Sequence, residues 1–197
     1  VGSNAAAAAA GALPGSSGAA IDGLASGAAS TSAAAAASPT HLTVALGLAS
    51  GHVVVLSGEV PPQGSGGKAR LSHWRRLSVR PDSGDMWSVT GLEITGTSDL
   101  QSLFVVTESQ TLSCHLQTNT KTVLDPQGSC SPRCCCLRPG GALLTVARAE
   151  GLYDYTSDTR AGCTVFEGVK QRLGTFGRYL LVVTREDSAS VASSAST

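Results

Sequence analysis

The sequence has few aromatic residues and few charged ones, and its charges balance. Only 4% of the 197 residues are aromatic and 14% are charged, with 14 basic side chains against 14 acidic ones. A net charge of zero excludes a general basic field that would recruit nucleic acid or anionic membrane, although a local patch remains open. Alanine inflates the apolar fraction of 42%, so we expect roughly 150 residues after the first 40 to build the core.

Signals of secretion and of membrane insertion are also missing. No run approaches the roughly 18 strongly apolar residues of a spanning helix. The sequence has no glycosylation sequon and no basic-then-apolar leader. Because it begins with Val1 rather than Met, we expect a fragment of a longer product. We predict an intracellular, soluble or peripheral protein with reduced thiols.

The motifs of common enzymes are absent as well. The sequence contains no phosphate-binding glycine loop, no dinucleotide-binding glycine pattern after a strand, no zinc-protease helix and no recognisable carboxylate pair. Its histidines lie in or beside predicted strands rather than in motifs: they are His41, His52, His73 and His115. We therefore predict a protein that is not an enzyme, with no catalytic residues and no cofactor.

Both ends of the chain have low-complexity sequences. Residues 1–40 are almost wholly Ala, Gly and Ser, and residues 188–197 read in the same way. Short alanine runs interrupted by Gly and Pro have no large side chains to bury. We predict disorder or frayed helix in residues 1–40, a disordered tail in residues 188–197, and a folded domain between them, residues 41–187.

The folded part repeats one short pattern. In residues 42–56, LTVALGLASGHVVVL, two apolar runs flank a small-residue turn that ends in Gly51, which predicts a β-hairpin. Residues 102–116 and 142–155 repeat it, and residues 179–187 resemble a first strand and turn of the same pattern. Aligning Ala45, Val105, Thr145 and Val182 gives intervals of about 60, 40 and 37 residues, the shorter ones close to one propeller blade. We predict an all-β fold: two and a half to three blades of a larger WD40-like propeller.

A cysteine-rich stretch, CSPRCCCL in residues 130–137, resembles a metal site at first sight. The spacing of Cys130 and Cys134 suits zinc, but Cys135 would point to the opposite face of a strand, and no second pair with metal-site spacing follows. We interpret these cysteines as small core residues. We predict no bound metal and no disulfides, and rank an enzyme using this cluster lowest.

A basic stretch forms the second ambiguous segment. Residues 68–80 contain a tryptophan, Trp74, and five basic side chains: Lys68, Arg70, Arg75, Arg76 and Arg80. A basic cluster beside a tryptophan would suit a nucleic acid. The alternative that we favour is a solvated strand whose tryptophan anchors it to the core.

Several pieces of the sequence, in this order, resemble the N-terminal propellers of the vacuolar protein sorting-associated protein 11 family. The pieces are VALGLASGHVVVLSGEV (44–60), VTGLEI (89–94), LFVVTESQTLSCHL (103–116), VLDPQG (123–128), DYTSDTRAGCTVFEGVKQ (154–171) and RYLLVVTRED (178–187). None of these pieces belongs to the family's α-solenoid or RING zinc module, and the insertion at residues 68–85 stretches the first interval.

The resemblance implies a subunit of the class C core shared by the HOPS and CORVET complexes, which tether endosomal and vacuolar or lysosomal membranes before fusion. From it we expect a non-catalytic scaffold acting in vesicle-mediated protein transport. Its partners would be other vacuolar protein sorting subunits, and it would lie in the cytoplasm, peripherally on late endosomes and vacuoles. The alternative function is a β-domain that binds nucleic acid through Lys68 to Arg80.

Overall fold

The computed structural model describes residues 6–10, 40–61, 66–81, 84–96 and 100–185. These residues form strands joined by turns and loops, so the prediction of an all-β fold is confirmed. None of them belongs to a helix long and apolar enough to cross a membrane. The strands are β1 (Ala6–Ala10), β2 (Thr40–Leu48), β3 (His52–Val60), β4 (Arg70–Ser78), β5 (Val89–Thr95), β6 (Ser102–Thr107), β7 (Thr111–His115), β8 (Lys121–Asp125), β9 (Cys135–Leu137), β10 (Leu144–Ala147), β11 (Gly151–Tyr155), β12 (Arg160–Val165), β13 (Lys170–Phe176) and β14 (Tyr179–Thr184).

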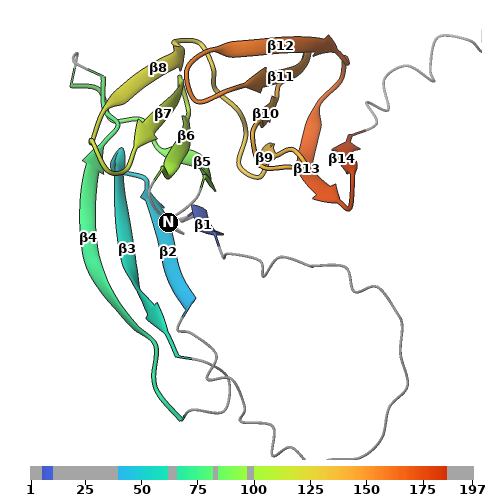
Figure 1. The fold of residues 1–197 in the computed structure, drawn as a ribbon. Helices are drawn as coiled ribbons and strands as arrows, with labels where there is room; N and C mark the ends of the chain where they lie inside the picture. The colour runs from blue at the N-terminus through green and yellow to red at the C-terminus, as the bar shows by residue number, and fades with distance from the viewer. Residues whose placement is uncertain (1–5, 11–39, 62–65, 82–83, 97–99, 186–197) are drawn as a thin grey trace, which may run out of the picture.

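Each group of successive strands forms its own antiparallel sheet. Among the described residues, β1–β4, β5–β8 and β9–β12 make three four-stranded sheets, in chain order, and β13 and β14 make a two-stranded one. We number these sheets first to fourth. The first strands of neighbouring sheets, β1, β5, β9 and β13, contact one another in turn, while β4, β8 and β12 lie at the far edges (Figure 1). This is the radial arrangement of a propeller sector, as predicted.

The recurring hairpin is the second and third strand of each four-stranded sheet. β2 and β3 pair from Thr40↔Val60 to Leu48↔His52, and the turn between them ends in Gly51 at φ +69°. Glycine adopts this left-handed conformation without the steric cost of a Cβ. The equivalent hairpins β6–β7 and β10–β11 confirm the predicted repeat, and β14 holds the second-strand place in the fourth sheet.

Three separate cores hold the sheets face to face. The first and second sheets bury the largest cluster, with Val53, Val55, Leu92 and Leu103 among its members. The second and third sheets bury Phe104, Val106, Cys135, Leu144, Val146 and Tyr155. The third and fourth sheets bury Cys134, Cys136, Ala147, Leu152 and Leu173, with Leu180 and Val182 packed against them. Burial on both faces explains why the inner strands β6 and β10 are wholly buried.

The alanine-rich segment differs from its prediction where it is described. Ala6–Ala10 is a strand, β1, that pairs antiparallel with β2, with Ala8 opposite Ala45. Helix or disorder was expected there, but pairing along a free strand edge uses backbone hydrogen bonds and needs no large side chain. Residues 11–39 and the predicted tail at residues 188–197 lie outside the described residues. Because β1 completes the first sheet and β13 and β14 form half of a fourth, the described strands make about three and a half blades. The prediction was two and a half to three blades.

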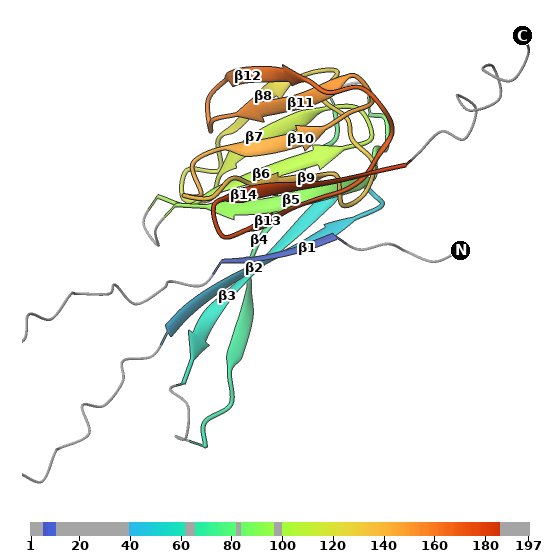
Figure 2. The same cartoon turned by 90° about the vertical axis from the view of Figure 1, so that its right-hand side faces the viewer.

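Among the described residues, none covers the outer apolar face of the fourth sheet. Leu180 and Val182 pack toward the third sheet, and the residues that alternate with them point the other way. Exposed on that outer face are Phe176, Tyr179, Leu181 and Val183, at 74%, 58%, 51% and 48%. Figure 1 shows β13 and β14 at the right-hand end of the described strands, and Figure 2, which views this end, shows them in front of the other sheets. The described sheets therefore form an open sector, not a closed ring.

Candidate functional site

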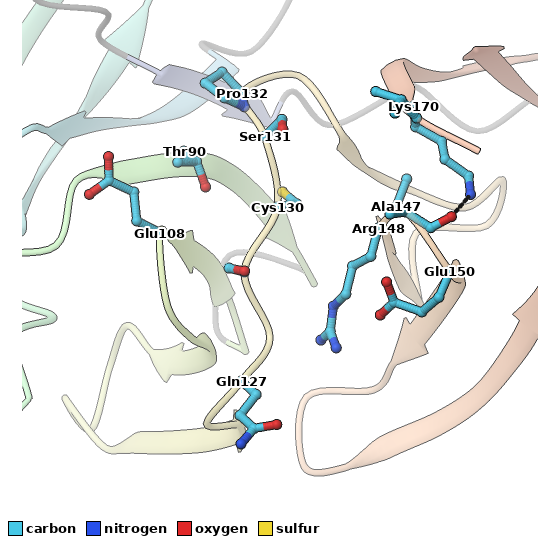
Figure 3. Close-up of a pocket in the computed structure, with 13 residues that line it drawn as sticks. Thr90, Glu108, Gln127, Cys130, Ser131, Pro132, Ala147, Arg148, Glu150 and Lys170 are labelled. Carbon is cyan, nitrogen blue, oxygen red and sulfur yellow. Dashed lines mark hydrogen bonds between the residues drawn. The ribbon is translucent and has the colours of Figure 1, made fainter. Parts of the chain in front are cut away.

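A cleft of about 640 Å³ opens where the second, third and fourth sheets meet. Its walls are the start of β5, the β6–β7 turn, the connection from β8 to β9, the β10–β11 turn and the start of β13. Figure 3 shows Thr90 and Glu108 on one side, Arg148 and Glu150 on the other, and Cys130 between them. The cleft thus lies on the face of the sector that carries the hairpin turns.

A three-residue polar network fixes the wall between the second and third sheets. Nη2 of Arg148 lies 2.7 Å from Oδ2 of Asp125 and donates to the Tyr155 hydroxyl, also at 2.7 Å. The Tyr155 hydroxyl in turn donates to Asp125 at 2.8 Å. Burial works to raise the pKa of Asp125, but hydrogen bonds from Arg148, the Gln127 N–H and Tyr155 outweigh it and lower the pKa.

The guanidinium of Arg148 is held from a second side. It stacks on the Tyr153 ring at 4.1 Å, and the Tyr153 hydroxyl donates to Glu150 at 3.0 Å. The Nε of Arg148 is buried and has no hydrogen-bond partner among the described residues. Arg148 is therefore a fixed positive charge in the wall of the cleft.

Lys170 closes the side of the cleft next to the fourth sheet. Its Nζ donates to the carbonyl oxygen of Ala149 at 2.8 Å and to that of Phe166, and it lies 4.9 Å from the centroid of the Phe166 ring. The residue is only 5% exposed. These contacts tie the start of β13 to the third sheet.

The cysteine-rich stretch divides between two cores, as the alternation of a strand requires. Cys135 lies in the core between the second and third sheets, and Cys134 and Cys136 lie in the core between the third and fourth. The interpretation of these cysteines as core residues, with Cys135 facing away from its neighbours, is confirmed. Burial raises the pKa of Cys136 to about 12, which suits an inert core thiol.

Cys130 has a different environment from the other cysteines. It is half-buried in the wall of the cleft and accepts a hydrogen bond from the Cys135 thiol, which lowers the pKa of Cys130. Burial opposes this shift, while the Thr90 hydroxyl and the charge of Arg148 add to it. Among the described residues no group of three His, Cys, Asp or Glu side chains is placed to hold a metal ion; the absence of bound metal stays a prediction.

The basic stretch at residues 68–80 contains β4 (Arg70–Ser78), the outer strand of the first sheet. Trp74 packs against the core and stacks with Arg75 at 5.5 Å. Arg75 also donates to the carbonyl of Gln117 at 2.7 Å, and Arg80 donates to that of Ser50 at 3.0 Å. Two of the arginines therefore serve the sheet's own packing, which favours the anchored-strand interpretation over a nucleic-acid groove.

Comparison with known proteins identifies the family. A family model described as PEP5/VPS11 N-terminal matches residues 24–197. The chain belongs to the PEP5/VPS11 N-terminal family. This confirms the resemblance given by the sequence.

A curated relative in this family is the vacuolar protein sorting-associated protein 11 homolog of Dictyostelium discoideum. It is 26% identical over 147 residues, which cover 71% of this chain and 14% of the relative. The chain thus spans a small part of the relative's length.

Sequence reasoning missed the polar network of the cleft. Asp125 ends β8 and begins a turn, Arg148 follows β10, and Tyr155 ends β11. Each position looks ordinary in the sequence of this PEP5/VPS11 N-terminal chain, and only the packing of the second sheet on the third brings them together. The sequence offers one clue to this network: Tyr155 lies in an apolar strand, and the hydroxyl of a buried tyrosine needs a hydrogen-bond partner.

Proposed function

We propose that this chain is part of a non-catalytic scaffold subunit of an endosome and vacuole (lysosome) tethering complex of the HOPS and CORVET type. It acts in vesicle docking and protein transport. Its surfaces bind other vacuolar protein sorting subunits, and it reaches the membrane peripherally, through the complex. The observation that carries the proposal is the family match over residues 24–197, together with the name of the Dictyostelium relative.

The structure of the cleft supports a binding role more than a catalytic one. Its charged groups are engaged in holding the walls: Arg148 with Asp125, and Lys170 with two carbonyl oxygens. Glu108 and Glu150 stay exposed on opposite walls. Such a surface offers shape and a mixed charge pattern to a partner protein, as in ordinary protein interfaces.

The test is recovery of partners from cells with the tagged full-length parent protein, followed by a salt titration. We expect other vacuolar protein sorting subunits at stoichiometric levels, retained as salt rises, because docking on a mixed surface depends less on salt than phosphate binding does.

The rival function, binding of nucleic acid through residues 68–80, is tested in the same preparation. Arg70→Ala and Arg76→Ala remove exposed side chains of β4, and Arg172→Ala on β13, also exposed, is the matched control. RNA or DNA that is recovered with the parent and lost only in the β4 variants would overturn the scaffold proposal.

A further inference from the structure

The charges of the chain are unevenly spread, although their sum is zero. Residues 60–81 contain five of the 14 basic side chains and none of the 14 acidic ones. This stretch includes β4, which lies at the far edge of the first sheet (Figure 1). The rest of the chain is therefore net acidic, and the first sheet has a basic outer edge.

Three of the five cations at this edge are exposed and are not used by the fold. Lys68, Arg70 and Arg76 are exposed, and within the described ranges none of them forms a hydrogen bond or an ion pair. By contrast, the guanidiniums of Arg75 and Arg80 donate to backbone carbonyl oxygens. The three exposed cations can therefore bind an anionic surface without breaking a contact of the fold.

The first sheet extends past the other sheets as a projecting arm. Its strands β2, β3 and β4 have nine residues each, whereas the strands of the second and third sheets have three to seven. The residues Arg70–His73 at the start of β4 are all exposed, and Figure 2 shows β3 and β4 extending away from the stacked strands. Glu59 lies opposite Arg70, but no ion pair joins them in the described part of the chain. The arm thus presents its cations to the solvent.

One apolar side chain lies among these cations. Leu71 follows Arg70 and is 39% exposed. It lies opposite Gly58 of β3, which has no side chain to cover it. Peripheral proteins bind membranes by this combination, in which an apolar side chain enters the boundary between headgroups and acyl chains and neighbouring cations attract anionic lipids.

The edge of β4 suits a flat surface better than an added strand or a nucleic acid. Its register with β3 shifts between Val55 and Leu56, so that Trp74 is an extra residue. A bulge of this kind interrupts an edge strand and hinders pairing with a further strand. Trp74 also packs against the core, so its ring is not a free platform on which a base could stack.

We propose that the edge formed by Lys68, Arg70, Leu71 and Arg76 binds directly to a membrane surface rich in anionic phospholipids. The three cations attract the charged headgroups, and Leu71 enters the boundary below them. Each cation close to such a surface strengthens binding about five-fold. This contact goes beyond the proposed function, in which the other subunits bring the chain to the membrane.

Vesicle flotation with the whole 197-residue chain tests the contact, because protein bound to vesicles rises while protein aggregates sink. The probes are vesicles of phosphatidylcholine alone and vesicles that also contain about a quarter phosphatidylserine. We expect the chain to float with the anionic vesicles only. It should dissociate from them as NaCl rises from about 0.1 M to about 0.5 M, because salt screens exposed charges. Flotation with neither kind of vesicle, or equally with both, would overturn the proposal.

Charge-removing variants locate the contact on the chain. Lys68→Gln, Arg70→Gln and Arg76→Gln are each expected to weaken flotation about five-fold, and Leu71→Ser is expected to weaken it as well. Arg172→Gln, which changes an exposed residue of β13, is the matched control and should leave flotation unchanged. Circular dichroism spectra check that the variants keep the fold. An equal loss in Arg172→Gln would mean that any cation of the chain serves, and the assignment to β4 would then be wrong.

Conservative variants separate a membrane from other anionic partners. A lipid surface responds to charge, so Arg70→Lys and Arg76→Lys are expected to retain flotation. An acidic protein or a nucleic acid that uses the forked guanidinium would bind lysine less well, so lost flotation in the lysine variants contradicts a membrane contact. Recovery of partner subunits is measured separately with the full-length parent, so a failure of vesicle binding is distinguishable from a failure of the proposed function.

Discussion

At the scale of single residues, buried polar groups affect the stability of the chain and make that stability depend on pH. Glu93 lies on β5, facing the core that contains Cys135, and burial raises the pKa of its carboxyl to about 7. In the unfolded chain the same group has a pKa near its ordinary value of 4.5. Between these values the folded chain holds a proton that the unfolded chain has lost.

The first prediction follows from this difference. Because the folded state binds more protons, the free energy of unfolding falls as the pH rises from about 4.5 to about 7, and then levels. Glu93→Gln is expected to remove this fall and to stabilise the chain at pH 8 by on the order of 2 kcal/mol. Thermal melting by circular dichroism at pH 4.5, 6 and 8 measures it. A variant that loses stability with pH as steeply as the parent would show that Glu93 is not the group responsible.

The second prediction concerns the hydroxyl of Tyr155. The residue is fully buried and its hydroxyl binds both Asp125 and Arg148. Tyr155→Phe leaves these two buried groups short of a partner and is expected to cost about 1–3 kcal/mol of stability. Tyr153→Phe is the control, since its hydroxyl binds the exposed Glu150 and its loss should change stability by less than about 0.5 kcal/mol. Equal effects in chemical denaturation would refute the role given to the network.

At the scale of elements, the contact between the second and third sheets depends on one glycine. Gly91→Ala places a methyl group against the sulfur of Cys135, and overpacking of this kind costs about 1–3 kcal/mol. We expect Cys135→Ala to rescue it, because the Cβ of Cys135 lies 3.6 Å away, at ordinary contact distance. A double-mutant cycle measures the coupling; additive effects of the two changes would contradict the proposed contact.

The elements also show what the sequence allowed us to predict. The hairpin at β2–β3 was predictable because alternating apolar runs and the glycine of its turn are local signals, and so was the split of Cys135 from Cys134 and Cys136 between two faces. β1 was not predictable, because Ala6–Ala10 pairs through its backbone and its sequence favours helix. The polar network of Asp125, Arg148 and Tyr155 was not predictable either, because it depends on how two sheets pack.

At the scale of the whole molecule, the sector has apolar faces at both of its ends. The outer face of the fourth sheet exposes Phe176, Tyr179, Leu181 and Val183. On the first sheet, Leu42, Val44 and Leu46 alternate with buried residues of β2 and are only half-buried. A closed propeller covers such faces with its next blade. Uncovered, they favour association between copies.

The outer face of the fourth sheet gives a matched pair of variants. Leu181→Lys replaces an exposed residue and is expected to reduce self-association while leaving the fold intact. Leu180→Lys, the adjacent residue, puts a charge against the core between the third and fourth sheets and is expected to unfold β13 and β14. Dynamic light scattering and circular dichroism separate the two effects; if Leu181→Lys leaves association unchanged, this face is not where copies meet.

Sedimentation velocity of the unmodified chain, combined with its thermal melting curve, tests the open sector most directly. In the described part of the chain no strand pairs with the outer edge of β14, and apolar faces are exposed at both ends of the sector. Such a stack is expected to sediment as heterogeneous, concentration-dependent species and to melt over a broad range. A monodisperse monomer that melts in one sharp transition would contradict the account.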